Sequence, residues 1–155
     1  MDNSSYLSQE KFNELKKELV DLQTIERKKV AEQLEYAKSL GDLSENAEYH
    51  EARDKQADIE DRIKELQDIL KNAVIISEKK NKDGLVVMGS KVEVKKSSGD
   101  PREFIIVGSE EADMTLNKIS HHSPIGAALM GKKKGDKIEV TTPKGDVVYT
   151  LLDVK

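Results

Sequence analysis

Apolar residues recur at spacings of three and four from Phe12 to Leu22, which is the pattern of one buried helix face, and the pattern continues more weakly to Ala37. This predicted seam consists of Phe12, Leu15, Leu19, Leu22, Ile25, Val30, Leu34 and Ala37. No glycine or proline interrupts the stretch between Ser8 and Leu40, and Ser8 can cap a helix that begins after it. The pattern therefore predicts one helix of about 30 residues, about 45 Å long.

A second helical pattern begins within a few residues of Gly41, a residue type that often ends helices. Its seam alternates steps of four and three, as in a coiled coil, and consists of Ala52, Gln56, Ile59, Ile63, Leu66, Leu70 and Ala73. Because the connection is so short, the two helices must run antiparallel. We therefore predict a long antiparallel coiled-coil hairpin over residues 1–75, with its tip at residues 41–49.

After Ala73 the apolar period shortens and becomes typical of strands. Strands are predicted at residues 74–77, 85–88, 91–94, 104–107, 137–142 and 147–154, with turns at 97–101 and 143–146. Ser123 followed by Pro124 is typical of a helix start, and Gly131 of its end. Residues 76–155 are therefore predicted to form a small antiparallel sheet with one short helix, which makes the whole chain an α+β protein.

Composition and charge narrow the possible classes of function. Charged residues make up 36% of the chain and aromatic residues 4%, which suits an exposed helical rod better than one large core. The absence of cysteine excludes disulfides and cysteine-ligated zinc. Residues 1–75 hold 12 basic and 18 acidic residues and the remainder 14 and 12, so neither half has the concentrated basic face typical of duplex DNA binding.

The start of the chain, Met1-Asp2-Asn3-Ser4-Ser5, lacks the basic region and apolar run of a signal peptide. Apolar runs elsewhere stay well short of the ~20 residues that a membrane-spanning helix needs. We therefore expect a cytoplasmic protein with no membrane partner.

Asp42 and Glu45 are two of the carboxylates in the predicted tip. Asp-x-x-Glu at a helix start is close to a capping box, and spacing alone favours that interpretation. Carboxylate oxygens at the positive end of a helix dipole also suit Mg²⁺. Because two carboxylates do not complete an octahedral shell, such a metal would need further ligands from a substrate phosphate or another protein. The two interpretations do not exclude each other.

Other candidate groups have simpler interpretations. The adjacent His121 and His122 point in different directions and are predicted to lie in a surface loop. The run Lys132-Lys133-Lys134 follows the predicted short helix and is expected to be a solvated turn. Ser44 has no histidine at a spacing that indicates a hydrolase, and no phosphate-binding glycine loop is present.

Two long motifs lie far apart in the chain, one in the predicted tip and one at the predicted short helix. The first is Gly41-Asp42-Leu43-Ser44-Glu45-Asn46-Ala47-Glu48-Tyr49-His50, followed by Ala52-Arg53. The second is Ile119-Ser120, then Ser123-Pro124-Ile125-Gly126-Ala127-Ala128-Leu129, and Gly131 through Gly135-Asp136. Both motifs resemble those of the bacterial transcript cleavage factors, the Gre family, in the family's order. The resemblance covers essentially the whole chain.

The resemblance implies that the hairpin enters the secondary channel of RNA polymerase, while an FKBP-like C-terminal domain, residues 76–155, docks at the channel's outer rim. The protein would not be an enzyme but a cofactor that stimulates the polymerase's own cleavage activity. Its tip acids would help to hold a second Mg²⁺ in the polymerase active site, where water attacks the backtracked transcript. The implied partners are RNA polymerase and the nascent RNA 3′ end, with DNA met only within the elongation complex.

The resemblance also implies roles for single residues. Asp42 and Glu45 correspond to the family's catalytic acids, which are Mg²⁺ ligands shared with the polymerase. The implied tip contacts to RNA are Lys38, Asn46, Tyr49 and Arg53. At the first of these positions the family usually has arginine, so lysine keeps the charge but loses the planar fork. The docking loop corresponds to His122, Ser123 and Pro124.

Two alternative functions stay open. Inhibitory Gre homologues occupy the same channel and block it, although their tips carry more acids than this Asp-x-x-Glu arrangement. The second half could instead be an FKBP-type prolyl isomerase or chaperone, but such proteins line their pocket with aromatic residues, and only Phe104 and Tyr149 occur here. Within the family, the five acids and one arginine of residues 42–54 favour cleavage of short RNA fragments.

Overall fold

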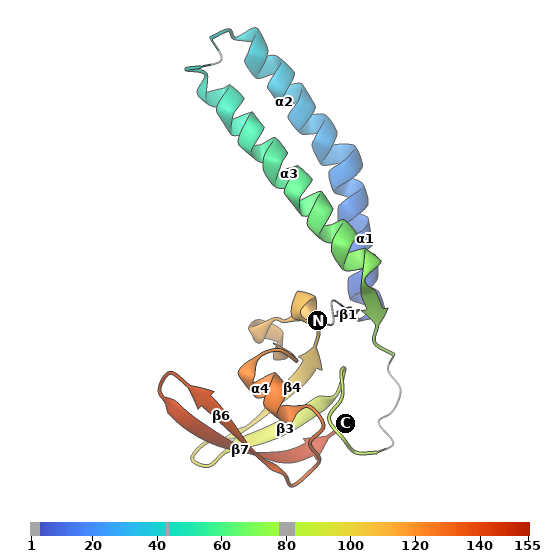
Figure 1. Ribbon diagram of the computed structural model, residues 1–155, viewed down its shortest axis with the longest axis vertical. Helices are drawn as coiled ribbons and strands as arrows, with labels where there is room; N and C mark the ends of the chain where they lie inside the picture. Colours follow the sequence, from blue (N-terminus) through green and yellow to red (C-terminus); the bar gives the residue numbers. More distant parts are fainter. Residues whose placement is uncertain (1–3, 43, 78–82) are drawn as a thin grey trace. The chain divides into compact units, whose positions relative to one another are not determined.

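The computed structural model describes residues 4–42, 44–77 and 83–155. Its contacts divide the chain into two compact units (Figure 1). One is the helical stretch Glu10–Ala73, and the other joins Met1–Gln9 to Val74–Lys155. The sequence predicts residues 1–75 as a single unit, but residues 4–9 group with the second half of the chain, where Ser5–Leu7 contacts the one-turn helix Ser109–Glu111.

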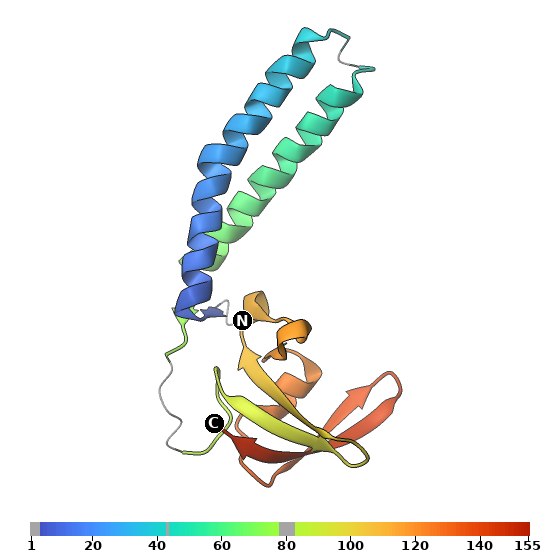
Figure 2. The same ribbon diagram turned by 180° about the vertical axis from the view of Figure 1, so that it is seen from behind.

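The helical unit is the predicted antiparallel hairpin. Its first arm consists of α1 (Gln9–Asp21), a five-residue π-helical segment η1 (Leu22–Glu26) and α2 (Arg27–Ser39), and its second arm is α3 (Ala47–Lys71). The two arms run side by side in both views (Figures 1 and 2). Their buried residues are Leu15, Val30, Leu34 and Ala37 in the first arm and Ala52, Ile59, Ile63, Leu66 and Ile69 in the second. In α3, Ile69 is thus buried where the pattern predicts Leu70, which is half-buried.

The π-helical segment explains why one predicted seam residue is wrong. Ile25 is predicted to face the partner helix, but it is 47% exposed. In a regular helix, the eight-residue step from Leu22 to Val30 would turn Val30 about 80° away from the seam. A π turn accommodates one extra residue and so brings Val30 back onto the seam. The N–H of Arg27 accordingly donates to the carbonyl of Leu22. Ile25 lies in the turn and is left outside the seam.

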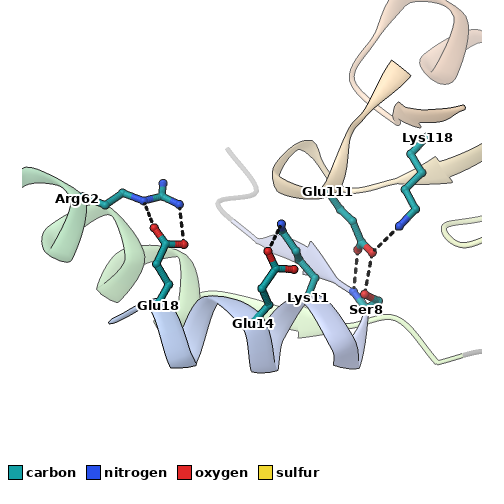
Figure 3. Close-up of polar contacts among 7 residues, drawn as sticks. All are labelled: Ser8, Lys11, Glu14, Glu18, Arg62, Glu111 and Lys118. Carbon is teal, nitrogen blue, oxygen red and sulfur yellow. Dashed lines mark hydrogen bonds and ion pairs between the residues drawn. The ribbon is translucent and has the colours of Figure 1, made fainter. Parts of the chain in front are cut away.

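Two forked ion pairs link the arms. Arg62 of α3 donates through Nε and Nη2 to the carboxylate of Glu18 in α1, at 2.7 and 3.1 Å (Figure 3). Arg27 donates in the same way to Glu60 at 2.7 and 2.6 Å. The planar guanidinium matches both carboxylate oxygens, so these pairs specify how the arms align. At an exposed surface they add little free energy of folding.

The second unit contains a five-stranded sheet in the order β5-β4-β3-β7-β6. The strands are β3 (Lys91–Lys96), β4 (Pro101–Val107), β5 (Lys118–Ser120), β6 (Lys137–Thr142) and β7 (Gly145–Val154). Neighbouring strands are antiparallel except β4 and β5, which run parallel with Ile106 opposite Ile119. The short helix α4 (Pro124–Leu129) contributes Leu129 to the core of this sheet. The predicted α+β class is confirmed, with one parallel pair that the pattern did not indicate.

One predicted strand, at residues 85–88, is wrong. Leu85 forms only an isolated bridge with Lys133. Ser90 then closes a tight turn, because its hydroxyl oxygen accepts the N–H of Val87 at 3.0 Å and its own N–H donates to the Val87 carbonyl at 3.0 Å. The turn takes up the backbone groups that a longer strand would use. Val86 nevertheless packs in the core and is fully buried.

Two short strands, β1 (Ser5–Leu7) and β2 (Ala73–Ile75), pair with each other. Just past the end of β2, the N–H of Ile76 donates to the carbonyl of Leu7 in β1 at 2.8 Å, and Leu7 is fully buried. The first strand was not predicted, because three residues are too short for an alternating pattern. No helix among the described residues combines the length and the apolar character needed to cross a membrane.

Candidate functional site

The tip of the hairpin begins where α2 ends. The N–H groups of Leu40 and Gly41 donate to the carbonyls of Ala37 and Lys38, each at 3.2 Å, which closes the helix with tight three-residue turns. Gly41 has a φ of +78°, a conformation that glycine adopts without steric cost. The prediction that Gly41 ends the helix is confirmed. Leu43, part of the predicted tip, lies outside the described residues.

Asn46 closes both arms of the hairpin with one side chain. Its Oδ1 accepts the N–H of Tyr49 at 3.0 Å, which is the N-cap bond of α3. Its Nδ2 donates to the carbonyl of Ala37 at 2.7 Å and to that of Gly41 at 3.2 Å. The sequence resemblance implied an RNA contact for Asn46, and the structure shows an internal function for its amide that sequence reasoning missed.

The capping box that the spacing of Asp42 and Glu45 favours is wrong, because Asn46 occupies the N-cap position. The carboxylate of Asp42 instead accepts a hydrogen bond from the hydroxyl of Ser44 at 2.9 Å. In the described part of the chain, the Glu45 carboxylate has no hydrogen-bond or ion-pair partner. Both acids are exposed. The fold therefore leaves two carboxylates facing solvent at the end of the hairpin.

These two carboxylates supply only part of a metal site. Their oxygens are the ligand type that Mg²⁺ prefers, but an octahedral ion takes six ligands. Within residues 4–42, 44–77 and 83–155, no group of three or more His, Cys, Asp or Glu side chains could hold a metal ion. The two tip carboxylates would therefore suit Mg²⁺ only together with further ligands from another molecule.

Three further predicted residues flank the tip. Lys38 in the last turn of α2 and Arg53 in the second turn of α3 are exposed, and neither forms an ion pair with any described residue. Tyr49 is half-buried, and its ring meets that of His50 edge-on with 5.7 Å between centroids. The helix turns on either side of the tip loop thus each carry an exposed cation.

In the second unit, the predicted docking residues begin helix α4. The hydroxyl of Ser123 accepts the N–H of Gly126 at 3.1 Å and donates to the carbonyl of Ser120 at 2.6 Å, and Pro124 occupies the first turn. The predicted cap and first-turn proline are confirmed. His122 is exposed, and its ring centroid lies 3.8 Å from that of His121.

Ser123 and Pro124 also line a mainly apolar groove with a volume of about 520 Å³. Both aromatic residues of the second half, Phe104 and Tyr149, line the same groove. Met114 lies at its edge with 68% of its surface exposed, which is unusual for a large apolar side chain. Sequence reasoning missed the groove because its walls come from β4, α4, the β6–β7 hairpin and the one-turn helix η3 (Met114–Leu116), which are separate in the sequence.

Models of known protein families match both halves of the chain. The model of the transcription elongation factor N-terminal domain matches residues 5–75, and the model of the GreA/GreB C-terminal domain matches residues 80–155. This chain belongs to the GreA/GreB family of transcription elongation factors. Both predicted motifs, at the tip and at α4, fall within the matched ranges.

Individual members of the GreA/GreB family match over nearly their full length. Transcription elongation factor GreA of Clostridium acetobutylicum is 50% identical over 142 residues, covering 91% of this chain and 90% of the relative. GreA of Acetivibrio thermocellus is 45% identical over 150 residues, covering 96% and 94%. Among solved structures, GreA factor homolog 1 of Thermus thermophilus is 28% identical with a TM-score of 0.44, covering 98% of this chain and 99% of that one.

Proposed function

We propose that this GreA/GreB-family protein binds RNA polymerase, inserts its hairpin into the secondary channel and stimulates Mg²⁺-dependent cleavage of backtracked nascent RNA. The observation that carries the proposal is the pair of exposed carboxylates, Asp42 and Glu45, at the end of a hairpin whose helix cap is made by another residue. The 25 residues of α3 alone extend about 38 Å at ~1.5 Å per residue, which gives the tip reach into a deep channel.

In this proposal, the two acids at the tip bind the metal ion and the two flanking cations bind RNA. When bound, Mg²⁺ supplies activation of water and neutralises charge that develops on the phosphate. Asp42 and Glu45 donate oxygen ligands, and the hydrogen bonds of Asn46 hold the loop before the partner arrives, which lowers the entropic cost of the encounter. The exposed cations Lys38 and Arg53 contact RNA phosphates, and Arg53 can bind two phosphate oxygens at once.

The second unit docks the protein on the polymerase rim through the apolar groove and the loop beside it. Supporting this, the loop residues Ser123 and Pro124 line the groove, and the exposed Met114 extends its apolar surface. Exposed apolar surface of this kind marks interaction sites on soluble proteins. His122 is exposed beside the groove and is a further contact in this proposal.

The proposal is tested by transcript cleavage in a backtracked bacterial elongation complex with Mg²⁺. Wild-type protein should release short 3′ fragments faster than the polymerase alone, and Asp42→Ala with Glu45→Ala should abolish this stimulation while binding to polymerase persists. The matched control is Asp61→Ala, which removes an exposed acid from α3 outside the acidic stretch 42–54 and should leave stimulation unchanged.

The same assay distinguishes the inhibitory alternative. A wild-type protein that binds polymerase and slows cleavage or elongation would replace the cleavage proposal by channel blocking. Loss of helix content in the double variant would mean that the two acids serve the fold.

Prolyl isomerase activity is a second candidate, and the groove lined by Phe104 and Tyr149 is the observation that favours it. The full-length protein is assayed with a proline-containing peptide, with Tyr149→Ala as the variant of the groove. Turnover that Tyr149→Ala abolishes would support this candidate. Absence of turnover by the wild type removes it.

A further inference from the structure

The N-terminal segment Tyr6–Ser8 contacts the second unit at two separate points. It is far from that unit in sequence but belongs to it by its contacts. Both contact points lie in the stretch of chain between β4 and α4. This stretch also forms one wall of the apolar groove, through residues that include Asp113, Met114 and Ser120.

The first contact joins Ser8 to Glu111. The Ser8 hydroxyl donates to Oε1 of Glu111 at 2.8 Å, and the Ser8 N–H donates to Oε2 at 3.1 Å (Figure 3). Nζ of Lys118 lies 3.4 Å from Oε1 of the same carboxylate. The Glu111 side chain is only 10% exposed. Lys118 itself lines the groove. A buried carboxylate with both oxygens engaged ties the N-terminal segment to one end of the groove wall.

The second contact joins Tyr6 to His121. The two rings meet edge-on with 5.4 Å between centroids, and the N–H of His121 donates to the carbonyl of Val107 at 3.0 Å. The N-terminal backbone approaches so closely here that position 108 must be glycine, because a Cβ added at Gly108 would lie 1.9 Å from the carbonyl oxygen of Tyr6. Tyr6 thus packs against the residue that directly precedes the docking loop His122–Pro124.

Between these two contacts, residues 112–117 of the groove wall bury little of their surface, and their side chains are all exposed. They form the one-turn helix η3 and loops, whereas β5, which follows them, pairs with β4 and buries Ile119. Segments with few buried contacts open locally at low free-energy cost. Contacts at the two ends of residues 112–117 therefore help to hold their conformation.

We infer that Tyr6 and Ser8 are positioning residues for the docking surface: they hold the groove wall and the loop His122–Pro124 in the conformation that a protein partner binds. The inference deepens the proposed function, since the partner is the polymerase rim. Loss of the two contacts raises the cost of ordering the wall during binding. It leaves the tip carboxylates and the hairpin seam unchanged.

The experiment compares full-length wild type with Tyr6→Ala/Ser8→Ala by two measurements. In the free protein, backbone amide chemical shifts of residues 112–123 should change in the double variant. With polymerase, the affinity should fall about tenfold, while the cleavage rate at saturating factor stays within about twofold of wild type, because only binding needs the ordered wall. Tyr6→Phe keeps the ring and should bind like wild type.

Glu14→Ala is the matched control, because it removes an exposed ion pair with Lys11 on α1 and should change neither measurement (Figure 3). Unchanged amide shifts and unchanged affinity in the double variant overturn the inference. If wild type itself does not bind polymerase, the proposed function fails and the amide shifts alone decide the inference. If the double variant does not fold, Glu111→Gln replaces it, since it removes the charge that Ser8 and Lys118 share but keeps the side-chain size.

Discussion

The side-chain amide of Asn46 bonds to the carbonyl of Ala37 at 2.7 Å and so joins the start of one hairpin arm to the end of the other. Its oxygen caps α3 through the N–H of Tyr49 at the same time. Helix ends leave such carbonyl and N–H groups without a partner inside the helix, and one residue here serves both ends. The order of the tip, and with it the placement of the two carboxylates, rests on this residue.

Asn46→Ala should therefore destabilise the tip and impair cleavage without unfolding the protein. Loss of a helix cap costs about 1 kcal/mol, and the bond to Ala37 is lost as well. We expect faster hydrogen exchange at the first amides of α3 and weaker stimulation of transcript cleavage. Asn46→Asp keeps the capping oxygen but not the donor, so it should fall between wild type and Asn46→Ala in both measurements.

Asp42→Asn should separate activity from stability at the tip. Asp42 has a φ of +34°, and asparagine adopts left-handed conformations at least as readily as aspartate. The variant can also still accept the hydrogen bond from Ser44. We expect an unchanged thermal midpoint but cleavage stimulation reduced about 100-fold, because the variant loses a charged ligand of a metal that supplies several kcal/mol of charge stabilisation. A lowered midpoint with retained cleavage would assign Asp42 to the fold instead.

Deletion of Ile25 should be tolerated, although it shortens a helix in the middle. Ile25 lies in the π turn and is outside the seam, so its removal leaves Leu22 and Val30 seven positions apart, one heptad of a regular helix. Deletion of Glu32, an exposed residue of regular α2, should instead rotate Leu34 about 100° out of the seam. Thermal unfolding followed by circular dichroism measures both, and equal losses of stability would contradict this account of η1.

Glu111 should make the second unit sensitive to acid. Burial raises the pKa of Glu111, but the hydrogen bonds from Ser8 and Lys118 together lower it further, so the net pKa lies below its usual value. A depressed carboxylate pKa stabilises the fold above the unfolded-state pKa, and this contribution is lost as pH falls through the folded-state pKa. Relative to wild type, Glu111→Gln should lower the free energy of unfolding at about pH 7, and the difference should shrink below the unfolded-state pKa of about 4.3 and vanish as pH falls through the folded-state pKa. A difference that persists in acid would show that the charge of Glu111 is not what stabilises the contact.

Several features could be predicted from the sequence because they depend on neighbouring residues. The two helical arms follow from their apolar spacing, the end of α2 from Gly41, and the start of α4 from Ser123 and Pro124. The exposed tip acids, Asp42 and Glu45, could be named as candidates because short polar stretches between helices lie in solvent. Their catalytic roles stay a prediction.

The wrong predictions concern positions where more than one local structure fits the sequence equally well. Asp42 and Asn46 are both suitable helix caps by residue type, and the carbonyl of Ala37 on the opposite arm favours Asn46, which alone can donate as well as accept. Ile25 fits the seam by spacing, and only packing against α3 decided that a π turn would exclude it.

Local sequence patterns are enough to specify the hairpin, its tip and the start of α4, because helix periodicity, glycine stops and caps act within a few residues. The groove at Phe104 and Tyr149 and the attachment of Tyr6 and Ser8 to its wall depend on the folded chain. These features join residues that are up to 103 positions apart. Their formation depends on which surfaces are left to bury once the sheet has formed, and no short window of sequence contains that information.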